Sequence, residues 1–204
     1  MTNTLDMELG CIDYWTYAII AYSFSATISF VRTISAILSK VKLNPDGNGY
    51  DQSPHFSDNE KDRLRQHYTR IAGTLGFWKN QAEKYKRAKN YCISWTIIIS
   101  IIVPILSQLI GEGNSNWFLT IVSTHGALIL AFYRGFKVEN NYQAFRLVES
   151  EFYDLRRELL DSPRNLGETS EKQIENFFKR VQDIRSSARQ AEIDNTPTID
   201  TQKS

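Results

Sequence analysis

Residues 90–111 read NYCISWTIIISIIVPILSQLIG, and this stretch decides the fold class of the 204-residue chain. It carries no formal charge, and eleven of its 22 residues are Ile, Val or Leu. Each aliphatic residue near the middle of a span contributes about −0.3 to −0.6 kcal/mol to insertion, which outweighs the cost of Pro104, Gln108 and the serines. Because about 20 helical residues cross the hydrocarbon layer of a bilayer, the stretch predicts a membrane helix over residues 91–111.

A second uncharged stretch follows at residues 117–133, after the polar turn GEGNSN at residues 111–116. Its 17 residues are close to the lower limit for a span, and pairing with the first helix across a short turn predicts the return leg of a hairpin over residues 116–134. Lys and Arg precede the first span and follow the second, whereas the turn has neither. The positive-inside rule therefore places both long flanks of the hairpin in the cytoplasm, as in a multi-pass protein of the cell (inner) membrane.

Cytoplasmic helices are predicted on either side of the hairpin, over residues 57–90, 135–161 and 169–190. Capping boxes, in which a Ser side chain accepts from a backbone N–H and a Glu or Gln reaches back, mark helix starts at Ser57 and Ser170. Apolar residues recur three and four positions apart in the first two helices, which is heptad spacing. The predicted fold class is an all-α membrane protein, a transmembrane helical hairpin that continues into a cytoplasmic antiparallel helical bundle. The heptad seam forms the internal core of the bundle, a contact between copies, or both, and its main positions are Leu75, Trp78, Tyr85, Phe145, Val148, Phe152, Leu155 and Leu159.

The ends of the chain follow a less regular pattern. Residues 14–31, within an amino-terminal segment 1–42, form a third uncharged run that contains five Ser or Thr residues. This run is either a third membrane segment or an amphipathic helix on the membrane or on the bundle, and its polarity slightly favours the amphipathic helix. Residues 43–56 are predicted to be a linker rich in Pro, Gly and Asn. Residues 191–204 are predicted to be a flexible tail, which leaves residues 57–190 as the membrane and bundle domain.

Composition argues against several function classes. The 24 basic and 23 acidic residues leave a net charge of +1, without the basic field typical of nucleic-acid binders. The two cysteines cannot form a multi-cysteine zinc site, and the three histidines lack the spacing of a metal or catalytic motif. We therefore expect no enzyme activity, no cofactor, no metal ion and no nucleic-acid partner.

Polar residues inside the two predicted spans are the candidates for function, because an intramembrane polar group is costly unless it faces a partner or water. In one interpretation they line an aqueous path through an oligomer, since a single hairpin has too few helices to enclose a pore. In the other, they form hydrogen bonds between the two helices worth about 0.6 kcal/mol each, and the small residues Ser123, Ala127 and Ala131 let those helices approach. The residues alone favour the second interpretation. The candidates are Thr96, Ser100, Pro104, Gln108, Ser123 and His125.

Two runs of sequence resemble the SLATT superfamily of two-helix membrane proteins: GFWKNQAEKYKRAKNY at residues 76–91 and ALILAFYRGFKVENNYQAFRLVESEFYDLRREL at residues 127–159. The likeness covers about residues 60–190. It implies a membrane effector of prokaryotic conflict systems such as antiviral defense, which forms pores when a separate sensor protein or a nucleotide signal activates it. The positions that the resemblance singles out are Trp78, Tyr85, Arg134, Tyr142, Glu149 and Glu151.

Two functions are expected from these patterns. The first is an oligomeric membrane effector that forms a pore or channel and is gated by its cytoplasmic helices. The second is a membrane-anchored scaffold or adaptor whose cytoplasmic helices recruit a partner without conduction. The first is preferred because the polar-faced hairpin and the resemblance agree on it, and its expected partners are the lipid bilayer and further copies of the same chain.

Overall fold

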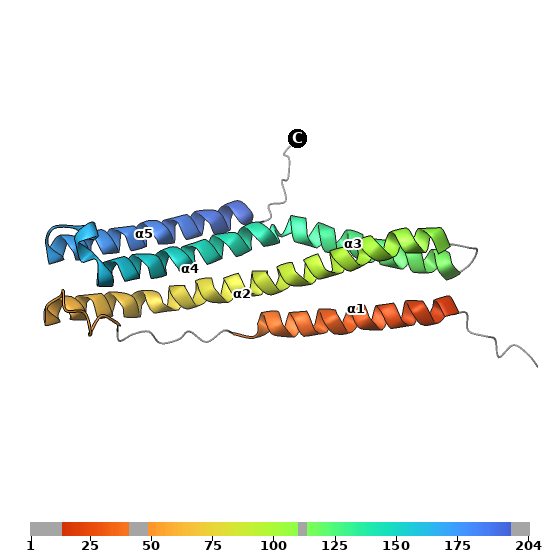
Figure 1. Cartoon of the computed structure of the whole chain (residues 1–204), viewed down its shortest axis with the longest axis horizontal. Helices are drawn as coiled ribbons and strands as arrows, with labels where there is room; N and C mark the ends of the chain where they lie inside the picture. Colours follow the sequence, from red (N-terminus) through yellow and green to blue (C-terminus); the bar gives the residue numbers. More distant parts are fainter. Residues whose placement is uncertain (1–13, 41–48, 110–113, 197–204) are drawn as a thin grey trace, which may run out of the picture. The chain divides into compact units, whose positions relative to one another are not determined.

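The residues that the structure describes are predominantly helical (Figure 1). A computed structural model describes residues 14–40, 49–109 and 114–196, and no strand occurs in these ranges. The all-helical class predicted from the sequence is therefore confirmed. Predictions that fall on residues 1–13, 41–48, 110–113 and 197–204 lie outside the described residues. The elements are α1 (Tyr14–Leu38), α2 (Asp58–Leu109), α3 (Asn114–Gly135), α4 (Val138–Asp161), the 3-10 helix η2 (Pro163–Leu166) and α5 (Ser170–Asn195).

The described residues divide into two compact units. Residues 14–35, 90–109 and 114–133 form one, which we call the apolar unit, and residues 36–40, 49–89 and 134–196 form the other, which we call the charged unit. α2 contributes to both, because it is one uninterrupted helix of 52 residues that even contains Pro104. The junction predicted near residue 90 therefore lies in the middle of a continuous helix.

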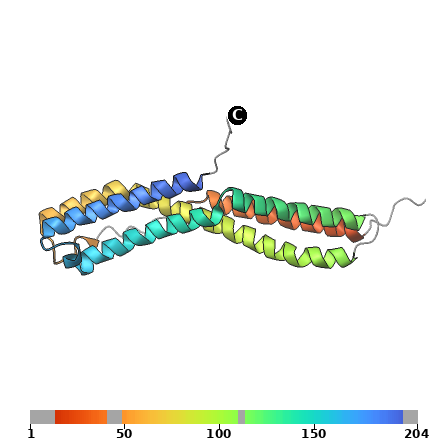
Figure 2. The same ribbon diagram turned by 90° about the horizontal axis from the view of Figure 1, so that it is seen from above.

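The apolar unit contains α1, the second half of α2 and α3, which pack along one another (Figure 2). Among the described residues, α1, α2 and α3 are long and apolar enough to cross a membrane, which is consistent with a membrane protein. No residue of α1 is buried, and large apolar side chains are exposed along it. These include Tyr17, Ile20, Phe24, Ile28 and Val31. Ser23, Ser25 and Thr27 are exposed among them, so both alternatives for residues 14–31 stay predictions.

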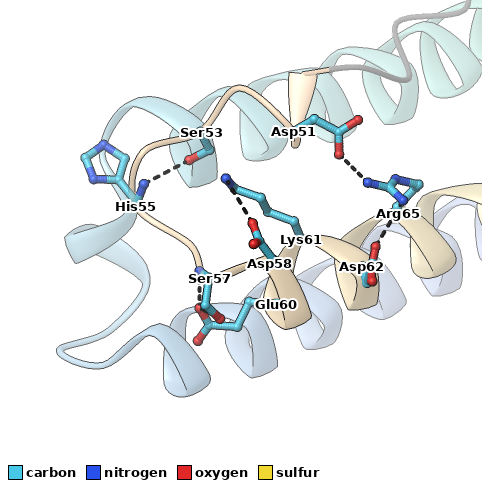
Figure 3. Close-up of polar contacts among 9 residues, drawn as sticks. All are labelled: Asp51, Ser53, His55, Ser57, Asp58, Glu60, Lys61, Asp62 and Arg65. Carbon is cyan, nitrogen blue, oxygen red and sulfur yellow. Dashed lines mark hydrogen bonds and ion pairs between the residues drawn. The ribbon is translucent and has the colours of Figure 1, made fainter.

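The start of α2 is fixed by side chains around Ser57 (Figure 3). Glu60 Oε2 accepts hydrogen bonds from the Ser57 backbone N–H at 2.7 Å and from the Ser57 hydroxyl at 2.8 Å. The glutamate half of the predicted capping box is present. The serine half differs from the prediction, because the Ser57 hydroxyl donates to the carboxylate and does not accept from a backbone N–H. Both bonds favour the ionised carboxylate and lower the pKa of Glu60.

The core of the charged unit is built from the predicted heptad seam. Residues of α2, α4 and α5 form a single buried cluster, and η2 adds Leu166 to it. All the seam positions lie in this cluster, with Tyr85 at its partly buried edge. Burial inside one copy favours the interpretation of the seam as an internal core. The other members on α5 are Ile174, Phe177, Val181, Ile184 and Ala188.

The end of the predicted linker is packed onto this core. Tyr50 is only 1% exposed, and Phe56 is also buried. The Arg156 guanidinium lies over the rings of Tyr50 and Tyr68, at 5.1 and 5.3 Å from their centroids, which is cation–π geometry. Burial raises the pKa of Tyr50 to about 12. Residues 49–56 are therefore irregular in conformation but part of the charged unit.

Both the start and the end of α5 differ from the prediction. Its N-cap is Thr169, whose hydroxyl accepts from the Lys172 backbone N–H, so the cap lies one residue before the predicted Ser170. The Gln173 side chain donates to the Gly167 carbonyl at 2.8 Å and does not complete a capping box with Ser170. α5 also continues to Asn195, past the predicted end at residue 190. Residues 191–195 lack a periodic apolar stripe, and for this reason the sequence alone predicts them to be part of the tail.

His67 is a titratable group within the core of the charged unit. Its ring stacks on Phe178, with centroids 4.1 Å apart, and meets Phe177 edge-on. Its Nδ1 atom is buried without a hydrogen-bond partner among the described residues. Burial, reinforced by the positive charges of Arg70 and Arg185, lowers the pKa of His67 to about 4.

We expect acid to destabilise the charged unit through His67. Because the pKa is lower in the folded state than in the unfolded chain, stability falls as the pH drops from about 6.5 to about 4. Solvent screening at this half-buried site limits the effect to about 1 kcal/mol. His67→Phe keeps the ring stacking without the titration, so its unfolding free energy in detergent should lose this part of the pH dependence. Parallel pH profiles for the wild type and the variant would contradict the assignment.

Candidate functional site

An aromatic and polar cluster fills the interior of the apolar unit. The aromatic cluster comprises Tyr22 of α1, Trp95 of α2, and Phe118 and His125 of α3. The Tyr22 hydroxyl and His125 Nδ1 are 2.7 Å apart. The Tyr22 ring meets the rings of Trp95, Phe118 and His125 edge-on, at 5.6 to 5.8 Å between centroids. The predicted candidate His125 therefore has a hydrogen-bonding partner within its own chain.

α1 supplies a second polar partner to this interior. The indole N–H of Trp95 donates to the Ser29 hydroxyl at 3.1 Å, and that hydroxyl donates to the Ala26 carbonyl at 2.9 Å. Sequence reasoning missed Tyr22 and Ser29. A local signal for them exists, because the partly buried residues of α1 recur three or four positions apart and are mostly small or hydroxyl-bearing. They are Trp15, Thr16, Ala18, Ile19, Tyr22, Ala26, Ser29, Thr33, Ala36 and Ile37.

α3 approaches α2 at Gly126. A Cβ atom at Gly126 would lie 3.0 Å from Ile99 Cγ2, tighter than ordinary van der Waals contact. The small residues predicted to bring the two helices together, Ser123, Ala127 and Ala131, are exposed on another face of α3. The close approach therefore depends on the glycine and not on that small-residue row.

The remaining polar candidates lie toward the outside of the apolar unit. Thr96 is partly buried and its hydroxyl donates to the Cys92 carbonyl at 2.8 Å. Ser100 is exposed and donates to the Thr96 carbonyl at 2.7 Å. Three of the candidates are exposed on α2, namely Ser100, Pro104 and Gln108, and we call these three residues the polar row. Ser123 on α3 is exposed as well, so the structure does not join these residues to His125 in one internal site.

The positions singled out by the resemblance are distributed over the charged unit. Trp78 is buried, Tyr85 stacks on Phe145 with centroids 6.0 Å apart, and Lys89 lies 5.0 Å from the centroid of the Tyr142 ring. These three aromatic residues therefore take part in packing and do not form a common site.

The acidic positions among them have separate environments. Glu149 is 5% exposed and pairs with Arg146 at 2.7 Å. Glu151 lines an open groove of about 410 Å³ between α4 and α5, together with further acidic residues. Arg134 is exposed at the end of α3. Within residues 14–40, 49–109 and 114–196, no group of three or more His, Cys, Asp or Glu side chains is placed to hold a metal ion.

Comparison of the chain with family models, with curated proteins and with solved structures gives no match.

We expect the packing of α3 on α2 to be sensitive to volume at Gly126. Gly126→Leu drives a side chain into Ile99, and overpacking of this kind costs about 1 to 3 kcal/mol. The unfolding free energy in mixed micelles measures the loss. Gly73→Leu is the matched control, because a Cβ at Gly73 of α2 meets no atom within 4 Å. Equal losses in the two variants would contradict the close approach at Gly126.

Proposed function

We propose that the chain is a subunit of a homo-oligomeric membrane effector that forms a pore or channel between copies and is gated by its cytoplasmic helices. The observation that carries this proposal is the polar row of α2, which is exposed next to isoleucines on a helix apolar enough for a span. An exposed polar row in lipid is unfavourable, and contact with other copies or with water removes that cost.

The proposed topology has three membrane helices. α1 ends close to Arg32, Lys40 and Lys42, and basic residues also border the spans of α2 and α3, whereas residues 111–116 have none. The positive-inside rule then places the amino terminus outside, and the charged unit and both long flanks of the α2–α3 hairpin in the cytoplasm. The apolar outer surface of α1 and its bonds to Trp95 and His125 support its place beside the hairpin.

The aromatic cluster argues against a pathway inside one copy. Tyr22, Trp95, Phe118 and His125 pack against one another in the space among the three helices. A conducting path must therefore run between copies, and the polar row is the surface of α2 available to line it. In this proposal His125 is a packing residue, and Ser100 and Gln108 are the lining residues.

The charged unit would control this pathway as a cytoplasmic antiparallel helical bundle. α2 passes from the bundle into the apolar unit as one helix, so a movement of the bundle can reach the polar row through an uninterrupted helix. The resemblance to the SLATT superfamily supports a role as an effector in antiviral defense, with a separate sensor protein or a nucleotide signal as the trigger.

A membrane-anchored scaffold is the second candidate function. The observation that favours it is the open groove between α4 and α5, a surface that a partner could contact. Glu151, Asp154 and Asp183 line it, together with Glu158 and Arg180, which pair at 2.7 Å. A scaffold would need the three spans only as an anchor, so it would tolerate changes to the polar row.

The topology predicts that Cys11 is outside the cell. In a Cys92→Ser variant, Cys11 is the remaining thiol, because the chain has two cysteines. A membrane-impermeant maleimide should then label intact cells or right-side-out vesicles. Ser204→Cys in a background without the native cysteines is the control, and it should be labelled only after permeabilisation. Labelling of Cys11 only after permeabilisation would show that α1 does not span.

The pore proposal predicts loss of conduction when the polar row is made apolar. The double variant Ser100→Leu with Gln108→Leu should reduce ion or dye efflux from proteoliposomes to the level of protein-free vesicles, because an apolar constriction excludes water. Ile98→Leu, an exposed apolar change on the same helix, is the control and should leave efflux unchanged. Wild-type protein that never releases dye, with or without nucleotides, would contradict the pore and favour the scaffold.

A further inference from the structure

We propose that Phe136 and Lys137, which join α3 to α4, form a two-state hinge. In the state seen here, the backbone of Lys137 is left-handed and separates the two helices. In the other state, Lys137 is helical and joins α3 and α4 into one continuous helix. The role of this hinge in gating rests on the proposed function, whereas its existence does not.

The first observation is the conformation of Lys137. Its φ of 44° and ψ of 45° lie in the left-handed region, where it stands alone among the described residues other than glycine. The Cβ atom makes this region unfavourable, and helices that end with a left-handed residue usually place Gly or Asn there. Here the glycine, Gly135, is two residues earlier and still within α3. The sequence therefore does not favour the break that the structure has.

The second observation is a pair of side-chain contacts that hold the break. Asn141 is 5% exposed, and its amide Nδ2 donates to the carbonyls of Phe136 and Lys137 at 3.0 and 3.3 Å. The Lys137 ammonium donates to the Asp194 carbonyl at 2.6 Å. That carbonyl belongs to the last turn of α5, where the helix dipole favours a positive charge. The left-handed state is thus retained by bonds that a continuous helix would have to break or rearrange.

The third observation is that nothing in the sequence prevents the continuous helix. No proline occurs between Ile105 and Ser162. α2 makes the comparable passage, from the charged unit to the apolar unit, without any break. The two states therefore exchange the contacts of Asn141 and Lys137 for unbroken helical hydrogen bonds and a relaxed backbone. Because Lys137 contacts α5, a signal that displaces the end of α5 favours the continuous helix.

Spin labels on either side of the junction distinguish the two states. Thr124→Cys and Ser150→Cys, both at exposed positions, are labelled in full-length protein without the native cysteines, diluted with unlabelled copies in vesicles. A continuous helix separates the two Cα atoms by about 39 Å, at 1.5 Å per residue, and a bent junction gives a shorter distance.

Two substitutions of Lys137 should move the distribution of distances between the two spin labels in opposite directions. Lys137→Met keeps the length of the side chain but loses the bond to Asp194, so the population near 39 Å should rise. Lys137→Gly makes the left-handed backbone favourable, so that population should fall. Lys179→Met, a second exposed lysine of the charged unit, is the control and should match the wild type.

The distances and the efflux of the same vesicles are scored separately. The same distance distribution in wild type, Lys137→Met and Lys137→Gly would overturn the hinge, whatever the vesicles release. Opposite shifts in the two variants support the hinge. If the distances shift but efflux does not change, the hinge is supported and its role in gating is overturned.

Discussion

The structure depends on a single helix that belongs to both of its compact units. α2 keeps one packing face over 52 residues, and the residues buried on that face pass from Leu64 and Leu75 in the charged unit to Cys92 and Ile99 in the apolar unit. The spacing stays the same, while the opposite face changes from charged to apolar side chains. Because heptad spacing specifies a packing seam whatever the character of the opposite face, one periodic pattern can continue from the charged unit into the apolar unit.

Periodicity explains why much of the fold could be predicted from the sequence. The apolar stretches of α2 and α3 and the seam of α4 are local patterns, and each can be found within a window of about 20 residues. The partner of α1 could not be found in this way, because Tyr22 and His125 are 103 residues apart. The packing of Tyr50 against Arg156 also joins residues far apart in the sequence. In addition, the short run rich in Pro, Gly and Asn that contains Tyr50 gives no periodic signal.

Other details depended on competition between neighbouring residues. Thr169 and Ser170 are both good N-cap residues, and the choice of Thr169 depends on how η2 delivers the chain to α5. Gly126 and the row at Ser123, Ala127 and Ala131 both allow close approach, yet the glycine lies on the buried face. Similarly, the left-handed break is at Lys137 and not at Gly135. Composition identifies such candidates, and packing decides among them.

The bond between Tyr22 and His125 also imposes an order of events during biosynthesis. Tyr22 is added to the growing chain 103 residues before His125. At about 5 to 20 residues per second, the interval is roughly 5 to 20 seconds. For that time the Tyr22 hydroxyl must rely on water, lipid headgroups or a nearby backbone carbonyl. Tyr22 therefore acquires the last of its partners in the apolar unit only after α3 has been synthesised.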